Sequence, residues 1–397
     1  MRLIRIGLWA AGPLLFLETL PAQTSQLPRV SDLRISAGVQ LTGVATTGAK
    51  ADINADNALE SVSNRLDFSI RRGRVSLSGR LLESIDFRVI FFFDNLGKDR
   101  FSGTRGTPAD EKVGIWDAIW TWHANPTWAS VTIGYFRPQL GRENMTSGFQ
   151  TNSSMDKLPT QVYLRAHTVG RSSGREMGVN VGGLRNRKKW GVNYNLGLFD
   201  TSHEKVTGQA NGGALWSPLV VARGALSLGD PEMTAYGIDY QTNYFNRRKG
   251  VTGAVSYARQ GANNAFMRNE TVGFDLLANY KNLNLDAELD LMRRRTLARA
   301  EYQDKVWHLR SGYNIRAGSE WVEPVAAYMK FTGAAQSPFQ NGRDELLDLG
   351  VNWYVRETRI KLNVHRTWQR GKAVCSYTDG RTFERGNLIG VGIQFVY

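Results

Sequence analysis

The stretch 114-GIWDAIWTWHANPTWASVTIGYF-136 contains two predicted strands and the turn between them. In residues 115–122 apolar and polar side chains alternate: Trp116, Ala118, Trp120 and Trp122 fall on one face, Asp117 and Thr121 on the other. Asn125-Pro126 is typical of a turn, and residues 129–135 alternate again. A soluble sheet would cover such an aromatic face with a second layer, for which the sequence contains no candidate. The pattern therefore favours a sheet whose apolar face contacts lipid.

The same two-residue period recurs along the chain. Clear examples are residues 65–71, 85–94, 190–199, 271–280, 283–291 and 387–397. These stretches have about the nine to eleven residues that a tilted strand needs to cross the hydrocarbon layer, whereas ordinary strands average roughly five or six. A change of phase at Arg72-Gly73 predicts a β-bulge there.

Short turns alternate with long polar loops. The predicted turns are 81–84, 123–127, 184–189, 229–233, 281–282, 317–320 and 356–358; the predicted loops are 47–64, 95–114, 137–174, 200–216, 293–303, 333–344 and 370–385. Transmembrane barrels have short periplasmic turns, longer external loops and, in bacterial single chains, an even number of strands. We count seventeen strand-like stretches, so residues 234–260 must supply a single crossing, which gives sixteen. The predicted fold is an all-β transmembrane antiparallel barrel.

The N-terminal residues 1–22 have the pattern of a signal peptide. Arg2 and Arg5 precede an apolar run, 6–17, and Ala22 fits the residue before the cut. The alternative, an uncleaved anchor, requires a longer apolar run. We therefore expect export to the outer membrane of a Gram-negative cell, a short periplasmic segment at 23–32 and a single barrel at 33–397.

Composition restricts the partners. The 397 residues carry a net charge of +14, which suggests nucleic acid, anionic lipid or a small anionic solute as a partner. The single cysteine, Cys375, excludes an intrachain disulfide and a zinc site with several thiolates. Basic residues are spread over strands and loops without a patch of stacking aromatics, and export also argues against nucleic acid.

Two sets of basic residues are candidates for an anion path. The pore-constriction candidates, all in the long loop, are Arg137, Arg142, Lys157, Arg165 and Arg171; the lumen-wall candidates are Arg71, Arg74, Arg80 and Arg88. Arginine keeps its charge and presents a fork of donors suited to phosphate. The loop set has the alternative of a solvated external loop, and the wall set that of pairing with acids such as Asp67, Asp86 and Asp117. Lumen-facing Asp286, Glu288 and Asp290 would oppose anion flow unless they are paired.

An enzyme is the second class of function considered. The histidines are His123, His167, His203, His308 and His365, and no Gly-x-Ser-x-Gly motif accompanies them. No metal-ligand spacing or phosphate-binding glycine loop occurs either. We predict a protein that is not an enzyme and has no catalytic residues, cofactor or metal, with a barrel hydrolase as the remaining alternative.

Four stretches carry a resemblance to a known family. They are residues 70–75 with Phe87-Arg88; 131–138 with Gly170-Arg171 and 175–179; 190–199; and 347–354 with its return strand. In order and spacing the chain resembles the phosphate-selective porin O and P family over nearly its whole mature length. Where phosphate-selective relatives have lysine-rich positions after the Ile-Gly strand, this chain has Tyr135, Phe136, Arg137, Leu140 and Gly141.

The resemblance implies a sixteen-stranded barrel, usually a homotrimer, whose third external loop folds inward and narrows the pore. It also implies a water-filled channel for passive diffusion of small anions, with phosphate or polyphosphate as candidates. A non-selective general porin is the alternative. The expected partners are small anions and outer-membrane lipid, with no nucleic acid.

Overall fold

The computed structural model describes residues 30–54, 58–104, 113–152, 156–170, 173–201, 215–374 and 383–397. The predicted signal peptide 1–22, Arg171, His203 and Cys375 lie outside the described residues. No helix in the described ranges is both long and apolar enough to span a bilayer.

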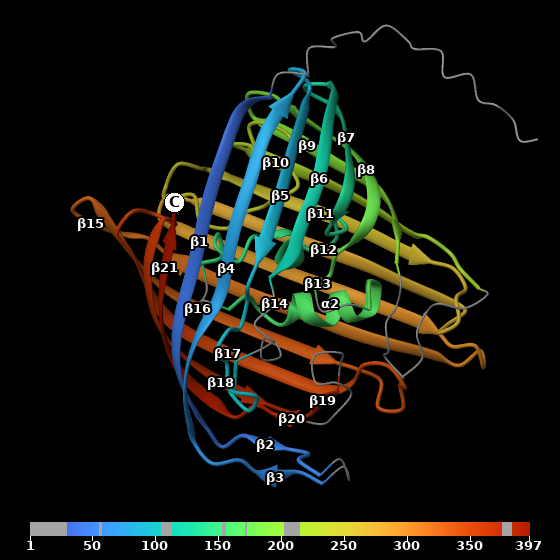
Figure 1. Cartoon of the computed structure of the whole chain (residues 1–397), viewed down its shortest axis with the longest axis vertical. Coiled ribbons are helices and arrows are strands. Elements are labelled where there is room, and N and C mark those ends of the chain that lie inside the picture. The colour runs from blue at the N-terminus through green and yellow to red at the C-terminus, as the bar shows by residue number, and fades with distance from the viewer. Residues whose placement is uncertain are drawn as a thin grey trace, which may run out of the picture.

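Sixteen long antiparallel strands in the described residues close into a barrel (Figure 1). They are β1 Val30–Thr47, β4 Arg65–Leu81, β5 Ile85–Phe92, β6 Gly114–Asn125, β7 Ala129–Phe136, β8 Glu176–Asn186, β9 Trp190–Asp200, β10 Leu219–Gly229, β11 Gly250–Gln260, β12 Arg268–Tyr280, β13 Leu283–Arg295, β14 Glu301–Tyr313, β16 Glu320–Thr332, β17 Asn341–Tyr354, β18 Ile360–Arg370 and β21 Asn387–Val396. Each strand pairs with the next along the chain, and β1 closes the ring by pairing with β21. The predicted fold class is confirmed.

Short elements complete the structure. The strands β2 Lys50–Ala51, β3 Glu60–Ser61, β19 Ala373–Val374 and β20 Phe383–Glu384 form a small separate sheet, and β15 Ile315–Ala317 extends the edge of β16. The helices α1 Arg142–Met145 and α2 Thr160–Thr168 belong to the connection between β7 and β8. We call the end of the barrel with connections such as 137–175 the loop end, and the end with connections such as 82–84 the turn end.

The two faces of each strand differ as the alternation predicts. On β13, Asn284, Asp286, Glu288 and Asp290 point inward and are buried, while Leu283 and Leu291 point outward and are exposed. Leu66 and Phe68 on β4 are 67% and 68% exposed on the outer surface. An outer wall of this kind suits hydrocarbon rather than water.

Two irregularities change which side chains face the lumen. Arg72 pairs with Gln40 and Ile70 with Leu41, so Arg71 is an extra residue of β4, next to the predicted bulge at Arg72-Gly73. Because of this bulge, both Arg71 and Arg72 contact groups inside the barrel. A second register shift in β6 leaves Trp116 unpaired, and its ring lies under two inward arginines. The expectation that Trp116 shares a face with Ala118 was wrong.

Three connections differ from expectation. The predicted loop 293–303 is mostly strand, because β13 continues to Arg295 and β14 begins at Glu301. The predicted turn 229–233 is the start of a longer connection, 230–249, and residues 234–260 supply the single crossing β11 as predicted. β1 begins at Val30, so residues 30–32 belong to the barrel rather than to the periplasmic segment.

The alternation predicts a position-dependent cost of charge on the outer wall. Leu289→Arg, at the middle of β13, should lower the free energy of unfolding by about 2–4 kcal/mol, because an arginine at the bilayer midplane loses its hydration. Gln303→Arg is the matched control near the loop end, where the expected cost is about 0–1 kcal/mol. Urea titration of the barrel refolded in lipid vesicles measures both, and equal costs would contradict the assignment of Leu289 to the membrane core.

Candidate functional site

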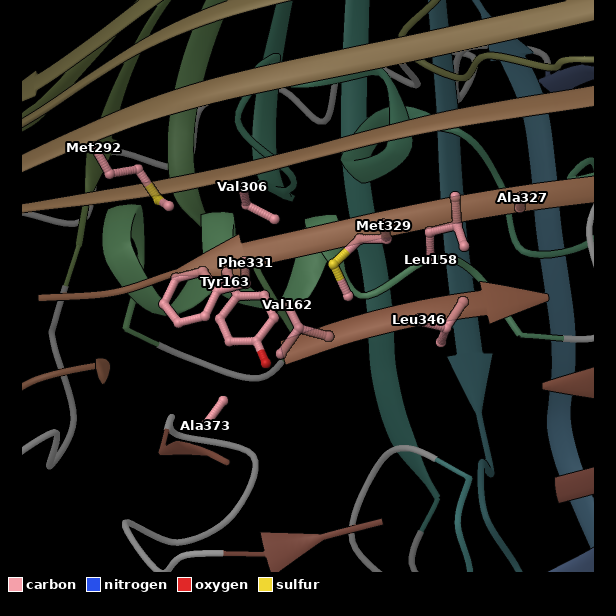
Figure 2. Packing of buried hydrophobic residues seen from close by; sticks show 10 residues of the cluster. All are labelled: Leu158, Val162, Tyr163, Met292, Val306, Ala327, Met329, Phe331, Leu346 and Ala373. Carbon is pink, nitrogen blue, oxygen red and sulfur yellow. The ribbon is translucent and has the colours of Figure 1, made fainter. Parts of the chain in front are cut away.

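The described residues of the connection 137–175 lie inside the barrel, where apolar residues of α2 pack against the inner wall (Figure 2). The ring of Tyr163 stacks on that of Phe331 with centroids 3.8 Å apart and planes within 4° of parallel. The Tyr163 hydroxyl donates a hydrogen bond of 2.6 Å to Asp344. The cluster consists of Leu158, Val162, Tyr163, Met292, Val306, Ala327, Met329, Phe331, Leu346 and Ala373. These contacts fix α2 against one side of the lumen.

A second apolar cluster holds the connection against another part of the wall, from β6 to β11. Its members are Ile119, Phe136, Leu140, Leu164, Val169, Phe199, Leu219, Val221 and Ala258. Gly141, just before α1, has a φ of +68°, and a Cβ there would lie 2.5 Å from Leu164 and 2.8 Å from Glu288. A lysine at position 141 would therefore clash, which gives a physical reason for glycine at this point of the loop.

A buried ion network anchors α1. One nitrogen of Arg310 lies 2.8 Å from both Glu143 and Asp286, and His308 lies 3.1 Å from Asp286. Burial is the largest influence on the pKa of Glu143 and raises it, but Arg310, Lys157 and His308 together lower the pKa below its ordinary value. Glu143, Asp286 and His308 offer ligand atoms close enough for a metal ion. Arg310 already supplies a positive charge to both carboxylates, so this set has no need of a metal.

Arg142, a predicted constriction residue, belongs to a second ion network. Its guanidinium lies 3.0 Å from Asp275 and 2.5 Å from Glu232, and it is fully buried. Arg223 of β10 also pairs with Asp275, at 2.9 Å. Two carboxylates therefore balance two arginines. Arg142 holds the loop to the wall and to connection 230–249.

Connection 230–249 enters the barrel from the turn end. Tyr240 is 3% exposed, and its carbonyl accepts a 3.3 Å hydrogen bond from the Ser147 amide of the long loop. Thr242 donates to the Gln150 carbonyl at 3.2 Å. The lumen therefore contains two inward segments that are hydrogen-bonded to each other, and Asp239 on the shorter one contacts both Arg88 and Arg137.

Three predicted constriction residues meet at Asn144. Arg137 and Lys157 donate to its backbone carbonyl, Lys157 at 3.3 Å, and Arg165 donates to its side-chain oxygen at 2.7 Å. We call Arg137, Lys157 and Arg165 the Asn144 cluster. All three are at least nine-tenths buried. Among the described residues no carboxylate lies within 4.0 Å of Lys157 or Arg165, and Arg137 is 3.7 Å from Asp239.

The electrostatics of this cluster favour an added anion. Burial, then Arg137 and Arg165, lower the pKa of Lys157 well below its ordinary value. Burial, then Arg175 and Arg165, lower the pKa of Arg137. Arg137 and Lys157 are thus destabilised both by lost hydration and by neighbouring cations. A bound anion would relieve both effects.

The four predicted wall residues all point inward and all have acidic partners. Arg71 pairs with Asp156, Arg74 with Asp94, Arg80 with Asp86, and Arg88 with Asp117 and Asp239. The alternative of pairing with lumen acids therefore describes this set, with Asp86 and Asp117 among the partners expected. Asp67 instead accepts a hydrogen bond from the backbone amide of Asp99.

Sequence reasoning missed several lumen cations. Arg175 is fully buried between Asp117, at 2.7 Å, and the ring of Trp116, at 3.6 Å. Arg72 and Lys361 also face inward, and Lys361 donates to the Thr151 carbonyl of the long loop at 3.2 Å. Lys361 lies in phase with Asn363 and His365 on β18, so its inward position was readable from the alternation.

Two cavities lie on either side of the Asn144 cluster. Arg71, Asp156, Lys157 and His365 help to line one of about 40 Å³. Arg80, Arg88, His123 and Asp239 help to line another of about 420 Å³ at the turn end. Lys157 shares the Asn144 carbonyl with Arg137, and Arg137 contacts Asp239. A continuous line of polar contacts therefore joins the two cavities through the cluster.

A Ser-His-Asp arrangement occurs at the turn end. His123 lies 2.9 Å from both Ser130 and Asp86. Ser130 is only 1% exposed, so its hydroxyl cannot reach a substrate, and Asp86 is also bound by Arg80 at 2.8 Å. This geometry serves to hold β5, β6 and β7 together rather than nucleophilic catalysis.

The comparisons with known proteins agree with this architecture. A family model described as phosphate-selective porin O and P matches residues 45–397. Among solved structures, an anion-selective porin from Comamonas acidovorans matches with a TM-score of 0.54 at 10% identity, covering 93% of this chain and 100% of that one. OprB of Pseudomonas putida matches with a TM-score of 0.59 at 9% identity, covering 92% and 94%.

The outer membrane channel DcaP of Acinetobacter baumannii matches with a TM-score of 0.53 at 10% identity, covering 92% of this chain and 97% of that one. At such identities these structures show a common fold. No curated protein matches the chain significantly in sequence.

The buried network of Arg310 predicts a large effect of removing it. Arg310→Leu should destabilise the barrel by about 3–5 kcal/mol, because Glu143 and Asp286 would remain buried without the arginine that both contact. Arg247→Leu, which breaks an exposed pair with Glu357, is the matched control, with an expected cost of about 0–1 kcal/mol. Thermal unfolding in detergent measures both costs. An Arg310→Leu barrel that is as stable as the wild type, and whose single-channel current shows no added fluctuation, would show that the loop needs no ionic anchor.

Proposed function

The chain belongs to the phosphate-selective porin O and P family, and on that premise we propose that its barrel is an outer-membrane channel through which small anions diffuse passively, with phosphate or polyphosphate as the candidate solutes. The observation that carries the proposal is the Asn144 cluster, in which three buried cations converge between two cavities. We assign Arg137, Lys157 and Arg165 to the anion path, and Arg142 to anchoring.

The cluster suits a hydrated or partly hydrated anion. Lys157 and Arg165 donate to neutral oxygens of Asn144, so an entering anion adds a charge-assisted hydrogen bond to either without first breaking a salt bridge with a carboxylate. Arg165 supplies a planar fork of donors, and Lys157 a compact ammonium with rotatable donors. The ion pairs of Arg71 and Arg88 on either side weaken binding there, so an anion would bind at the cluster and still leave.

Asp239 opposes this attraction from the shorter inward segment. Its carboxylate pairs with Arg88 and lies 3.7 Å from Arg137, while 38% of its side chain remains exposed to the turn-end cavity. It therefore acts as an internal anion that competes with the solute for two of the cations on the path.

The location follows the same reasoning. Membership of a porin family supports the outer membrane, and the loop end would face outward, since barrels of this kind have their longer loops outside. We extend the proposal to a homotrimer, which the family resemblance implies.

Phosphate block of chloride current tests the proposed site. In planar bilayers bathed in chloride, added phosphate should reduce single-channel conductance, and the double variant Lys157→Gln/Arg165→Gln should need at least about tenfold more phosphate, since a hydrogen bond to a charged group contributes about 1.5–3 kcal/mol.

Two controls separate charge from folding. Arg165→Lys keeps the charge and should retain most of the block, and Lys189→Gln removes one charge from the turn 187–189 outside the lumen. Chloride current that phosphate leaves unchanged in the wild-type protein would favour a general porin without an anion site. An equal loss of block in Lys189→Gln would attribute the effect to net charge.

Removing the negative charge of Asp239 should strengthen the preference for anions, whereas removing Lys157 and Arg165 should weaken it. Asp239→Asn should raise the anion-to-cation permeability ratio by a factor of about five, because a unit charge at 4 Å exerts about 1 kcal/mol in water. Arg88 keeps Asp117 at 3.8 Å, so the wall retains a partner. Reversal potentials in a salt gradient measure the ratio, with the exposed Glu357→Gln as the control. A lower or unchanged ratio would remove Asp239 from the path.

A further inference from the structure

At the loop end, one part of the barrel's outer wall carries basic residues and another part carries apolar residues. Arg259 of β11, Arg268 of β12, and Arg293 and Arg295 of β13 all point outward there, and Lys305 and Lys330 continue the row on β14 and β16. Figure 1 shows β11 to β14 as neighbouring strands. On β4, β5, β6, β8 and β9 the outward residues near the same end are apolar: Leu66, Phe68, Phe91, Ile115, Met177 and Leu198.

Aromatic residues mark the height of this row on the barrel. Tyr257 precedes Arg259 by two residues on the same face, Trp307 follows Lys305 by two, and Tyr328 precedes Lys330 by two. The rings of Trp307 and Tyr328 lie 5.3 Å apart. Belts of Trp and Tyr lie at the boundary between hydrocarbon and headgroups. The basic side chains, one step further from the membrane centre, lie at the level of the lipid headgroups.

The arginines of β11–β13 outnumber their acidic partners. Arg259 and Arg268 share Glu270, which lies 3.8 Å from Arg259. Arg293 pairs with Glu301, and Arg295 has no carboxylate within 4.0 Å among the described residues. Arg295 lies directly opposite Arg268 on β12, an arrangement that is unfavourable for like charges. It also lies opposite Glu301 on β14, which already pairs with Arg293. An anion bridging Arg268 and Arg295 would remove their repulsion.

We propose that Arg259, Arg268, Arg293 and Arg295 form a binding surface for the phosphate groups of a phosphorylated glycolipid in the outer leaflet. Guanidinium groups bind phosphate through paired hydrogen bonds, and Glu270 and Glu301 form ion pairs with three of the four arginines at the surface. About half of each of the Arg259, Arg268 and Arg293 side chains remains accessible to a headgroup. The surface lies outside the lumen and is independent of the solute that the channel carries.

Lipid titration of the refolded full chain in detergent tests the surface. Native mass spectrometry should show tight binding of lipid A that carries both phosphates, and much weaker binding of lipid A from which the phosphates have been removed. The variant Arg268→Gln/Arg295→Gln should bind the phosphorylated lipid roughly thirty-fold more weakly, since each basic side chain near an anionic surface contributes on the order of a factor of five.

The matched control is Lys188→Gln/Lys189→Gln, which removes two positive charges at the turn end. It should bind phosphorylated lipid A as the wild type does, and the conductance of both variants in chloride should be unchanged. Equal affinity of the wild-type protein for the two lipids would overturn the proposal even if the arginine variant failed to fold. Equal weakening by the two variants would assign the effect to total charge and overturn it as well.

Discussion

Every backbone N–H and C=O group within the hydrocarbon layer must find its hydrogen-bond partner inside the protein. The pairing of β1 with β21 meets this requirement by closing the sheet, so that no strand edge faces lipid. Closure also has a cost, because sixteen strands enclose more space than the side chains of the wall can fill. The lumen is therefore shaped by chain that is not part of the wall, namely the connection 137–175 and the shorter connection 230–249.

The contacts that anchor those two segments to the barrel wall also determine the position of the Asn144 cluster. Arg142, Glu143 and Asn144 are consecutive: the first two are fixed by ion networks to β10, β12, β13 and β14, and the third collects the cations of the cluster. Buried ion pairs add little net stability compared with apolar packing, but they specify orientation. The apolar clusters around Tyr163 and Leu164 supply the packing, and the ion networks determine where Asn144 lies. A disturbance of Arg310 therefore reaches the cluster through one residue of α1.

The wall could be read from the sequence because lipid imposes a two-residue period, which β13 follows over its whole length. The sequence does not predict the position of a side chain where a bulge interrupts that period, or where a residue lies in a connection inside the lumen. Trp116 turns inward through a bulge that depends on pairing with β5, and Tyr240 is buried by contacts with a distant loop. Inward Met329 and Phe331 are apolar because α2 covers them, although the apolar run 325–329 that leads up to them was a signal. The basic residues of the loop were found as a set, but only the fold separates anchoring Arg142 from the unpaired Lys157.

The basic residues of the chain therefore have different roles. Acids neutralise the wall arginines of β4 and β5, so these contribute orientation more than attraction. Attraction for a solute depends on charges that the fold leaves without carboxylates, and Lys157 and Arg165 are two lumen cations of this kind that meet at one residue, Asn144. Cations that are buried, mutually repulsive and bonded only to neutral oxygens are unfavourable in an empty barrel. The packing of the long loop sustains that unfavourable state. On the path proposed above, an anion entering between the two cavities would lower its energy, which would be the physical basis of selectivity by charge.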